Sequence, residues 1–172
     1  MPYNASTMDQ YAGVTTGENV STMQDRPVEP VGLVKALGIE LTETTPERVV
    51  ARMPITAMHL QPFGYLHGGA SITLAETVAS IGAHLASAPD KVAFGLEINA
   101  NHLRPKRSGT LTAVATPLHR GQTTHVWDVK IYDEAEKLIC VSRCTLALVA
   151  GERPDGSASA GQVSGSRDQT IV

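Results

Sequence analysis

The stretch QPFGYLHGGASITLAETVASIGAH, residues 61–84, passes from a loop into an apolar helix and decides how the rest of the chain folds. We expect the helix over residues 69–87, and from Ile72 to Leu85 its apolar residues run almost all the way round. A helix that is apolar on nearly every side is surrounded by protein. The pattern therefore predicts a sheet wrapped around this helix, with a second subunit closing the open side.

The segments on either side of the helix have strand character. A four-strand meander is expected after it, because short hairpin-length links separate alternating or β-branched runs at residues 92–105, 109–120, 124–133 and 137–149. Before the helix, residues 39–55 predict either two strand arms around a turn at Thr45–Pro46 or one long bent strand. A short helix with Val31, Val34 and Leu37 begins this unit, and Gly38 is expected to cap its end. The fold class is α+β, one antiparallel sheet covering a single long helix.

Polar segments bracket this unit at both ends of the 172-residue chain. Residues 1–28 show no sustained hydrophobic period, and residues 151–172 are rich in Gly, Ser and Asp. Both are predicted to be disordered. One globular domain is expected over residues 29–150, long enough to bury a core without a disulfide or a metal.

Composition excludes several classes of function. The net charge is −3 with mixed signs, which argues against nucleic-acid binding by bulk charge. No apolar run approaches the ~20 residues of a membrane span, and the first residues lack the pattern of a secretory signal. Cys140 and Cys144 lie four apart on a predicted strand and are interpreted as buried, reduced thiols, with no second Cys/His pair for zinc. We expect a cytoplasmic protein that binds neither a membrane nor a metal.

Glu76 is an unusual residue in the middle of the apolar helix. An isolated buried carboxylate costs several kcal/mol or becomes protonated, so either it has a partner or the function needs it. The alternative is a narrow polar stripe with Thr73, Thr77 and Ser80 that faces solvent. Ser80 stands one turn further along the same face.

The entrance to the helix, His67-Gly68-Gly69, is the second unusual feature. Glycine lets a ligand approach the backbone, and the first-turn N–H groups and the helix dipole favour an anion or a carbonyl that develops negative charge. The alternative is a tight loop that uses glycine for positive φ, with His67 as a capping residue. With Glu76 eight residues after Gly68 and a further histidine in NANHLRP, the pattern suits acyl transfer or proton abstraction beside a carbonyl. No GxSxG elbow or GxGxxG loop is present.

Three stretches, QPFGYLHGGASITLAETVAS, GLEINANHLRP and PLHRGQTTHVWDVKIYDEAEKLICVSRCTLAL, resemble hotdog-fold acyl-CoA thioesterases over residues 30–150. The likeness is to the PaaI-like bacterial branch with the 4-hydroxybenzoyl-CoA (Arthrobacter type) and 1,4-dihydroxy-2-naphthoyl-CoA thioesterases. The resemblance implies a sheet around a central helix and a dimer whose two sheets become continuous. It further implies an active site between the subunits with residues from both chains, commonly a tetramer, and CoA as part of the substrate without a cofactor.

The resemblance also implies catalytic roles. Glu76 matches the catalytic carboxylate, acting as nucleophile or as general base on water, and the Gly68 backbone N–H matches the group that polarises the thioester carbonyl. Gln61 is expected to hold the carbonyl or the water, His67 to orient the loop, and Ser80 to contact the attacking water.

His102 is expected to be catalytic as well, because it matches a histidine of the naphthoyl branch, and this match favours hydroxylated aromatic acyl groups. A second group of residues is expected to meet CoA. The LHRGQTT turn matches the CoA-contacting loop, with the candidates His119, Arg120, Gly121, Thr123 and Thr124. Arg104, with Lys106 and Arg107, is placed to meet CoA phosphates, although a solvated basic turn is an alternative for the last two. A hotdog hydratase and a non-catalytic acyl-CoA-binding domain remain alternative functions, but the Asp-x-x-x-x-His hydratase pattern is lacking.

Overall fold

The computed structural model describes residues 32–151. In chain order its elements are α1 (Gly32–Ala36), β1 (Glu40–Thr44), β2 (Val49–Pro54), the 3-10 helix η4 (Ala57–His59), α2 (Gly68–Leu85), β3 (Lys91–His102), β4 (Thr110–Arg120), β5 (Thr124–Tyr132) and β6 (Leu138–Ala150). The segments expected to be disordered, residues 1–28 and 151–172, lie outside the described residues, except for Gly151, whose N–H donates to the Asp90 carbonyl at 2.9 Å. The domain boundaries therefore stay a prediction.

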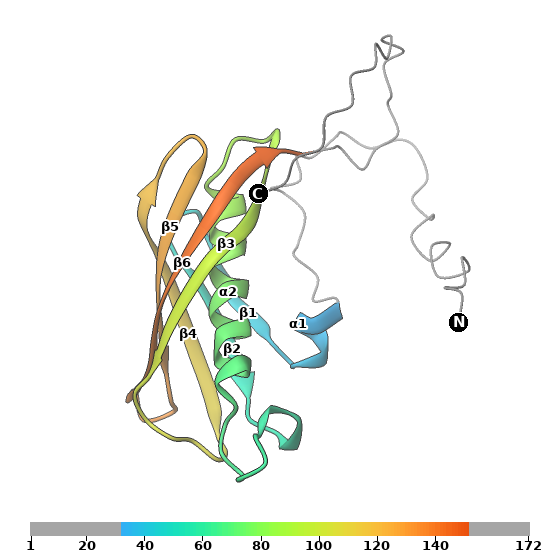
Figure 1. The fold of residues 1–172 in the computed structure, drawn as a ribbon, viewed down its shortest axis with the longest axis vertical. Coiled ribbons are helices and arrows are strands. Elements are labelled where there is room, and N and C mark those ends of the chain that lie inside the picture. The colour runs from blue at the N-terminus through green and yellow to red at the C-terminus, as the bar shows by residue number, and fades with distance from the viewer. Residues whose placement is uncertain (1–31, 152–172) are drawn as a thin grey trace, which may run out of the picture.

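One antiparallel sheet curves around one long helix and covers it on one side (Figure 1). Within the described part of the chain the sheet has six strands in the order β1-β2-β4-β5-β6-β3, and α2 packs against every strand from β2 to β6. On β5 the residues that face α2 alternate with outward ones, and Trp127, Val129 and Ile131 are fully buried. The helix buries a stripe with the 3–4 residue spacing of one helical face: Ser71, Leu74, Ala75, Val78, Ala79, Gly82 and Ala83.

The expectation of a helix enclosed on all sides holds only in part within one chain. The apolar Ile72 and Ile81 are half-buried and flank the buried stripe on its two sides, and Ile81 packs against the core. The side of α2 opposite the stripe carries Thr73, Glu76, Thr77 and Ser80, which are also only half-buried, and this is the side on which a second subunit is expected.

The expected four-strand meander is wrong at its first connection. β3 forms no hairpin with β4; it pairs with β6 from Lys91↔Ala150 to His102↔Cys140, while β4 pairs with β2 and β5. Residues 103–109 instead cross the end of the sheet, past β5 and β6. Three strand spacings amount to roughly 14 Å, and seven extended residues reach roughly 23 Å, so a short link does not require neighbouring strands. The two later hairpins, β4–β5 and β5–β6, form as predicted.

The structure decides between the two alternatives that the sequence left open for residues 39–55, two strand arms or one long bent strand. Two strand arms meet at a turn in which the Thr45 N–H donates to the Arg48 carbonyl at 2.9 Å. Gly38 follows α1 with a φ of +61°, so it ends that helix in the left-handed conformation that glycine tolerates. The expected glycine cap is confirmed.

Candidate active site

The N-terminus of α2 is built around His67 and two glycines. His67 Nδ1 accepts a hydrogen bond from the Gly69 N–H at 2.9 Å, so its ring caps the first turn of the helix. Neither Gly68 nor Gly69 has a positive φ. A Cβ on Gly68 would lie 2.7 Å from His102 Nε2, so glycine is needed here for close approach and not for turn geometry.

A pocket of about 400 Å³ opens beside this helix end. The loop before α2, the first helical turn and the link after β3 line it, contributing Gln61, Tyr65, Ser71 and His102 among apolar neighbours such as Ile139. The Phe63 N–H donates to Gln61 Oε1 at 2.6 Å, which fixes the side chain and leaves its amide N–H groups as donors. Such a mixture of apolar walls and a few polar groups suits a small organic ligand.

Ser71 is a pocket residue that the sequence reasoning missed. Its side chain is 1% exposed, and its hydroxyl has no hydrogen-bond partner among the described residues. A buried polar group without a partner is costly, which makes this hydroxyl a candidate for a ligand contact. A serine near the start of a helix carries no sequence signal for such a role, because serine is common there for local reasons.

Glu76 does not point into this pocket. Its carboxylate lies over Gly95 of β3: a Cβ there would come well inside 3.0 Å of Oε1, closer than Cβ atoms in proteins pack. No ion-pair partner of Glu76 occurs within residues 32–151. The hydroxyls of Thr73 and Thr77 donate to carbonyls of their own helix, at 3.0 and 2.7 Å, so they do not compensate the carboxylate. Ser80, one turn further, is half-buried.

The charge of Glu76 affects the pKa of the buried Cys144 thiol on strand β6. Burial, followed by the charges of Glu76 and Glu97, raises the pKa of Cys144 to about 12. Cys140 and Cys144 are both free and buried, as predicted. A thiol with so high a pKa stays protonated, so Cys144 is no nucleophile near neutral pH.

One chain does not bring its candidate residues together. Glu76 lies eight residues after Gly68, roughly 12 Å along the helix. On β3, Gly95 lies seven residues before His102, roughly 23 Å along the strand. Gln61, Gly68 and His102 therefore gather at one end of the sheet, while Glu76 sits near the middle.

The turn expected to contact CoA lies at the other end of the sheet (Figure 1). The Gly121 N–H donates to the Thr124 carbonyl at 3.0 Å, and the His119 ring lies against Gly121. Lys91, at the start of β3, donates to the Gln122 carbonyl, and the Thr123 carbonyl accepts from Leu148 at 2.8 Å. This turn is therefore close to the beginning of β3 and far from Gly68.

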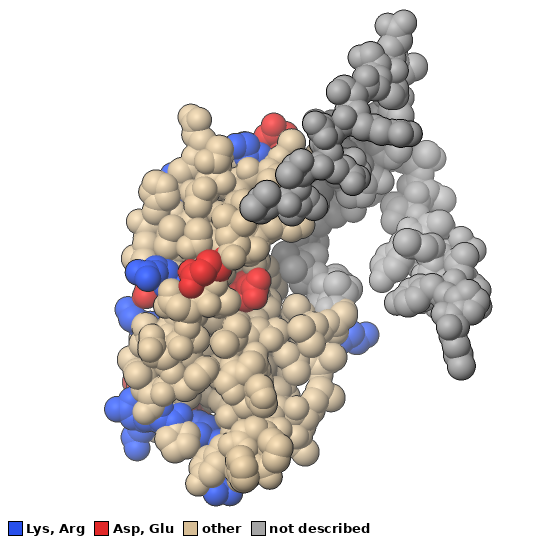
Figure 2. Space-filling model, viewed as in Figure 1, with Lys and Arg blue, Asp and Glu red and all other residues tan. Residues whose placement is uncertain are grey.

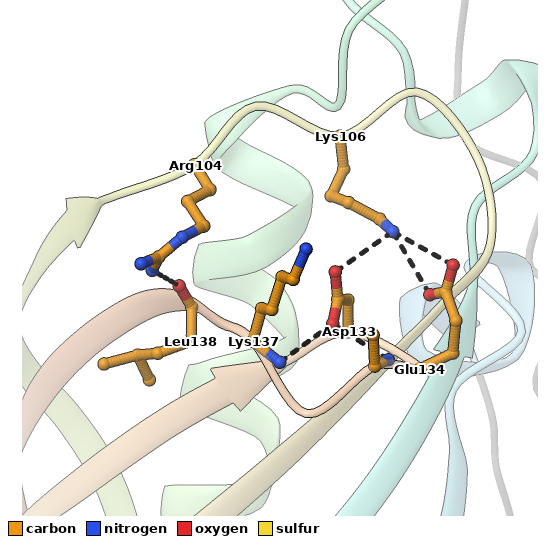
Figure 3. Close-up of polar contacts among 7 residues, drawn as sticks. Arg104, Lys106, Asp133, Glu134, Lys137 and Leu138 are labelled. Atoms are coloured by element: carbon orange, nitrogen blue, oxygen red, sulfur yellow. Dashed lines mark hydrogen bonds and ion pairs between the residues drawn. The ribbon is translucent and has the colours of Figure 1, made fainter.

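Two of the basic residues expected to meet CoA already have partners. Arg120 forms an exposed ion pair with Glu47 at 3.5 Å. Lys106 contacts Glu134 at 3.1 Å and Asp133 at 3.4 Å, and its hydrogen bond to Glu134 is the main cause that raises the Lys106 pKa (Figure 3). Lys106 therefore has a structural role in place of the solvated-turn alternative, because its contacts with Glu134 and Asp133 connect the link after β3 to the β5–β6 turn.

The other two cations flank the pocket. Arg104 donates to the Leu138 carbonyl (Figure 3), and Arg104 is one of the residues that line the pocket. The Arg107 guanidinium stacks over the Tyr65 ring, 3.8 Å from its centroid. Neither has an ion-pair partner among the described residues, so both keep their charge available to an anion.

Neither a spanning helix nor a metal cluster occurs in the part of the chain that the structure describes. None of its helices is long and apolar enough to cross a membrane. In the same 32–151 range, no three or more His, Cys, Asp or Glu side chains are grouped to hold a metal ion.

Known proteins resemble this chain over most of their length. A family model described as the thioesterase superfamily matches residues 63–140. ComA2 of Bacillus subtilis is 57% identical over 118 residues, 68% of this chain and 94% of that protein. The 1,4-dihydroxy-2-naphthoyl-CoA hydrolase of Listeria monocytogenes is 51% identical over 118 residues, 69% and 96% of the two chains. A solved thioesterase structure from Haemophilus influenzae matches with a TM-score of 0.65 and 47% identity, covering 68% of this chain and 82% of that one.

These matches agree with the fold, and they confirm the class of enzyme expected from the sequence, a thioester hydrolase of the hotdog fold. The chain belongs to the thioesterase superfamily.

Proposed function

We propose that this thioesterase hydrolyses an acyl-CoA whose acyl group is aromatic and hydroxylated, and that its active site is shared between two copies of the chain. One observation carries the proposal: Glu76 is a carboxylate without an ion-pair partner in the described residues, beside the open edge of β3. The 51% identity to a hydrolase named for 1,4-dihydroxy-2-naphthoyl-CoA supports the choice of acyl group, and so do the polar groups of the pocket.

The edge strand β3 supports a shared site. Its outer edge has no strand partner among residues 32–151, and Phe94 and Leu96 beside Gly95 are 57% and 64% exposed. A long, exposed, apolar edge strand pairs readily with another strand. Figure 2 shows uncharged residues over most of this side of the molecule, with acidic groups near its middle, basic groups along the left edge and toward the lower end, and charged groups of both signs at the top.

Antiparallel pairing of two β3 strands brings together the candidate residues that lie apart in a single chain. If the pairing runs the length of the strand, Lys91 of one copy lies beside His102 of the other. The turn at Gly121 of one copy then approaches the Gly68 end of the other, and each Glu76 sits near the shared middle. CoA can thereby meet one copy while its thioester meets residues of both. Assembly of two such dimers into a tetramer remains a prediction from the family resemblance.

In the proposed reaction the thioester carbonyl accepts hydrogen bonds from the Gly68 N–H and the Gln61 amide, which stabilise the oxyanion at the positive end of the helix dipole. The Glu76 carboxylate either removes a proton from a water molecule that attacks the carbonyl, with Ser80 helping to hold the water, or attacks the carbonyl itself. The C–S bond then breaks, and the CoA thiolate leaves and takes up a proton. Where Glu76 has attacked, a water molecule then hydrolyses the acyl–glutamate anhydride, which releases the acid and regenerates the carboxylate. The hydrolysis needs only these residues and water.

The test is thiol release from 4-hydroxybenzoyl-CoA and 1,4-dihydroxy-2-naphthoyl-CoA, with benzoyl- and decanoyl-CoA for comparison. Glu76→Ala and Glu76→Gln are expected to abolish turnover and keep the fold, whereas the matched control Glu97→Gln, an exposed carboxylate on β3, keeps activity. Wild-type turnover in either Glu76 variant contradicts the mechanism. Hydration of crotonyl-CoA without thiol release would indicate the hydratase alternative instead.

A mixing experiment tests the shared site. Glu76→Gln and Gln61→Ala chains, each inactive alone, are co-expressed with different tags and purified as a mixed dimer. If each site takes Glu76 from one copy and Gln61 from the other, one of the two sites is intact and about half of the wild-type activity returns. Complete inactivity of the mixed dimer would place both residues in the same chain's site.

A cytoplasmic location remains part of the proposal. It is supported by the two buried cysteines, Cys140 and Cys144, which are free and form no disulfide.

A further inference from the structure

We propose that Gly95 is a positioning residue for Glu76, because the missing side chain at this point of β3 is the space in which the carboxylate rests. The inference rests on the proposed catalytic role of Glu76. It adds a residue on another element, nineteen positions further along the chain, that sets where the carboxylate lies.

The contact involves the end of the glutamate side chain. A Cβ on Gly95 would overlap Oε1, whereas Cδ and Cγ would be 3.4 and 3.9 Å away, in ordinary contact. The carboxylate therefore lies directly over the Gly95 Cα, and its stem arrives from α2 at normal distances. Any residue other than glycine places its first side-chain atom where the carboxylate oxygen is.

Backbone geometry does not explain why residue 95 is glycine. The described glycines with positive φ are Gly32, Gly38, Gly64 and Gly109, and Gly95 is not one of them. Gly95 lies within strand β3 and has no left-handed backbone that would demand glycine. Glycine in a strand interior weakens the strand and often marks a close approach by another group. Here the approaching group is the Glu76 carboxylate.

The neighbouring residues of β3 distinguish Gly95 from the other positions of the strand. The pairing of β3 with β6 shifts register between Gly95 and Glu97, and such a bulge turns the local side-chain directions. The flanking Phe94 and Leu96 are large and exposed. Gly95 is thus a gap between two bulky residues, at the edge where the proposed second copy pairs.

The size of the effect follows from the geometry. In Gly95→Ala, Oε1 has to withdraw by about 1 Å to reach ordinary van der Waals separation. The displaced atom is the far end of a flexible side chain, so the fold accommodates the change. A misplacement of about 1 Å can lower a catalysed rate about 100-fold. We expect kcat to fall by about that factor while KM changes less than about twofold.

Two variants and one structure test the proposal. In Glu76→Asp the carboxylate is retracted by one methylene and no longer reaches residue 95, so adding Gly95→Ala should change kcat less than about threefold. An undiminished effect of Gly95→Ala in that background would show that it acts independently of Glu76. A crystal structure of Gly95→Ala decides the case even if Glu76→Asp is inactive: a displaced carboxylate supports the proposal, and an unmoved one overturns it.

The outcomes separate this inference from the proposed function. If Glu76→Gln is inactive but Gly95→Ala has wild-type kcat, only the role of Gly95 is wrong. If Glu76→Gln is active, the proposed mechanism fails, whatever the structure of Gly95→Ala shows. Light scattering on each variant ensures that a lost rate is not a lost dimer.

Discussion

Replacing Gly82 by alanine is expected to destabilise the fold, although alanine is the better helix former. In an open helix interior this change stabilises by about 1 kcal/mol. Here a new Cβ would lie 2.5, 2.6 and 3.0 Å from three ring carbons of Trp127, which is fully buried. The ring has to move by about 1 Å, and overpacking of this kind costs about 1–3 kcal/mol. The net loss is therefore about 1 kcal/mol, or about 4 °C in Tm for a domain of this size.

The chain offers a direct assay for this contact. Trp127 is its one tryptophan, so intrinsic fluorescence reports on the ring that the new methyl group strikes. Urea unfolding of Gly82→Ala is expected to show a lower midpoint with an unchanged m-value. In a Trp127→Phe background, followed by circular dichroism, the clash is gone and the same substitution should be neutral or stabilising. Stabilisation by about 1 kcal/mol in the wild-type background would refute the reasoning, since it would mean that the ring yields without cost.

Three further predictions follow from buried polar groups. Burial, followed by the charge of Arg120, lowers the pKa of His125. The stability that the neutral His125 side chain contributes is therefore complete above the ordinary pKa of 6.5, and it is lost as the pH falls below that value. His125→Gln should flatten this decline in urea titrations between pH 8 and 5, and an unchanged slope would contradict it. Burial raises the pKa of Cys140, and that of Cys144 lies at about 12, so native protein at pH 8 should not react with Ellman's reagent, whereas denatured protein should release two equivalents. Ser71→Ala should raise stability by about 1 kcal/mol and reduce the preference for hydroxylated over plain benzoyl-CoA about tenfold in kcat/KM; equal effects on both substrates would remove Ser71 from acyl recognition.

Local patterns predicted much of the fold. The apolar run identified α2 to within two residues at each end, observed over Gly68–Leu85 against 69–87 expected. The Gly38 cap and the β4–β5 and β5–β6 hairpins also formed as expected, because each depends on residues close together in the chain. The partner of β3 could not be predicted in this way. A short link favours a hairpin, but strand pairing across the chain depends on which edge remains available once the sheet has curved around the helix.

The candidate site shows the same difference between features that a local motif predicts and features that depend on packing between distant elements. By itself, the sequence determined the family, the donor-rich helix entrance at Gly68 and the carboxylate at Glu76, since these lie within one contiguous motif. Only the tertiary structure decided that β3 lies at the sheet edge, that the Glu76 carboxylate rests on Gly95, and that the carboxylate stays apart from the Gly68 entrance in a single chain. The physical reason is that a hydrophobic period records which face of an element is buried, whereas contacts between distant elements depend on how those elements pack.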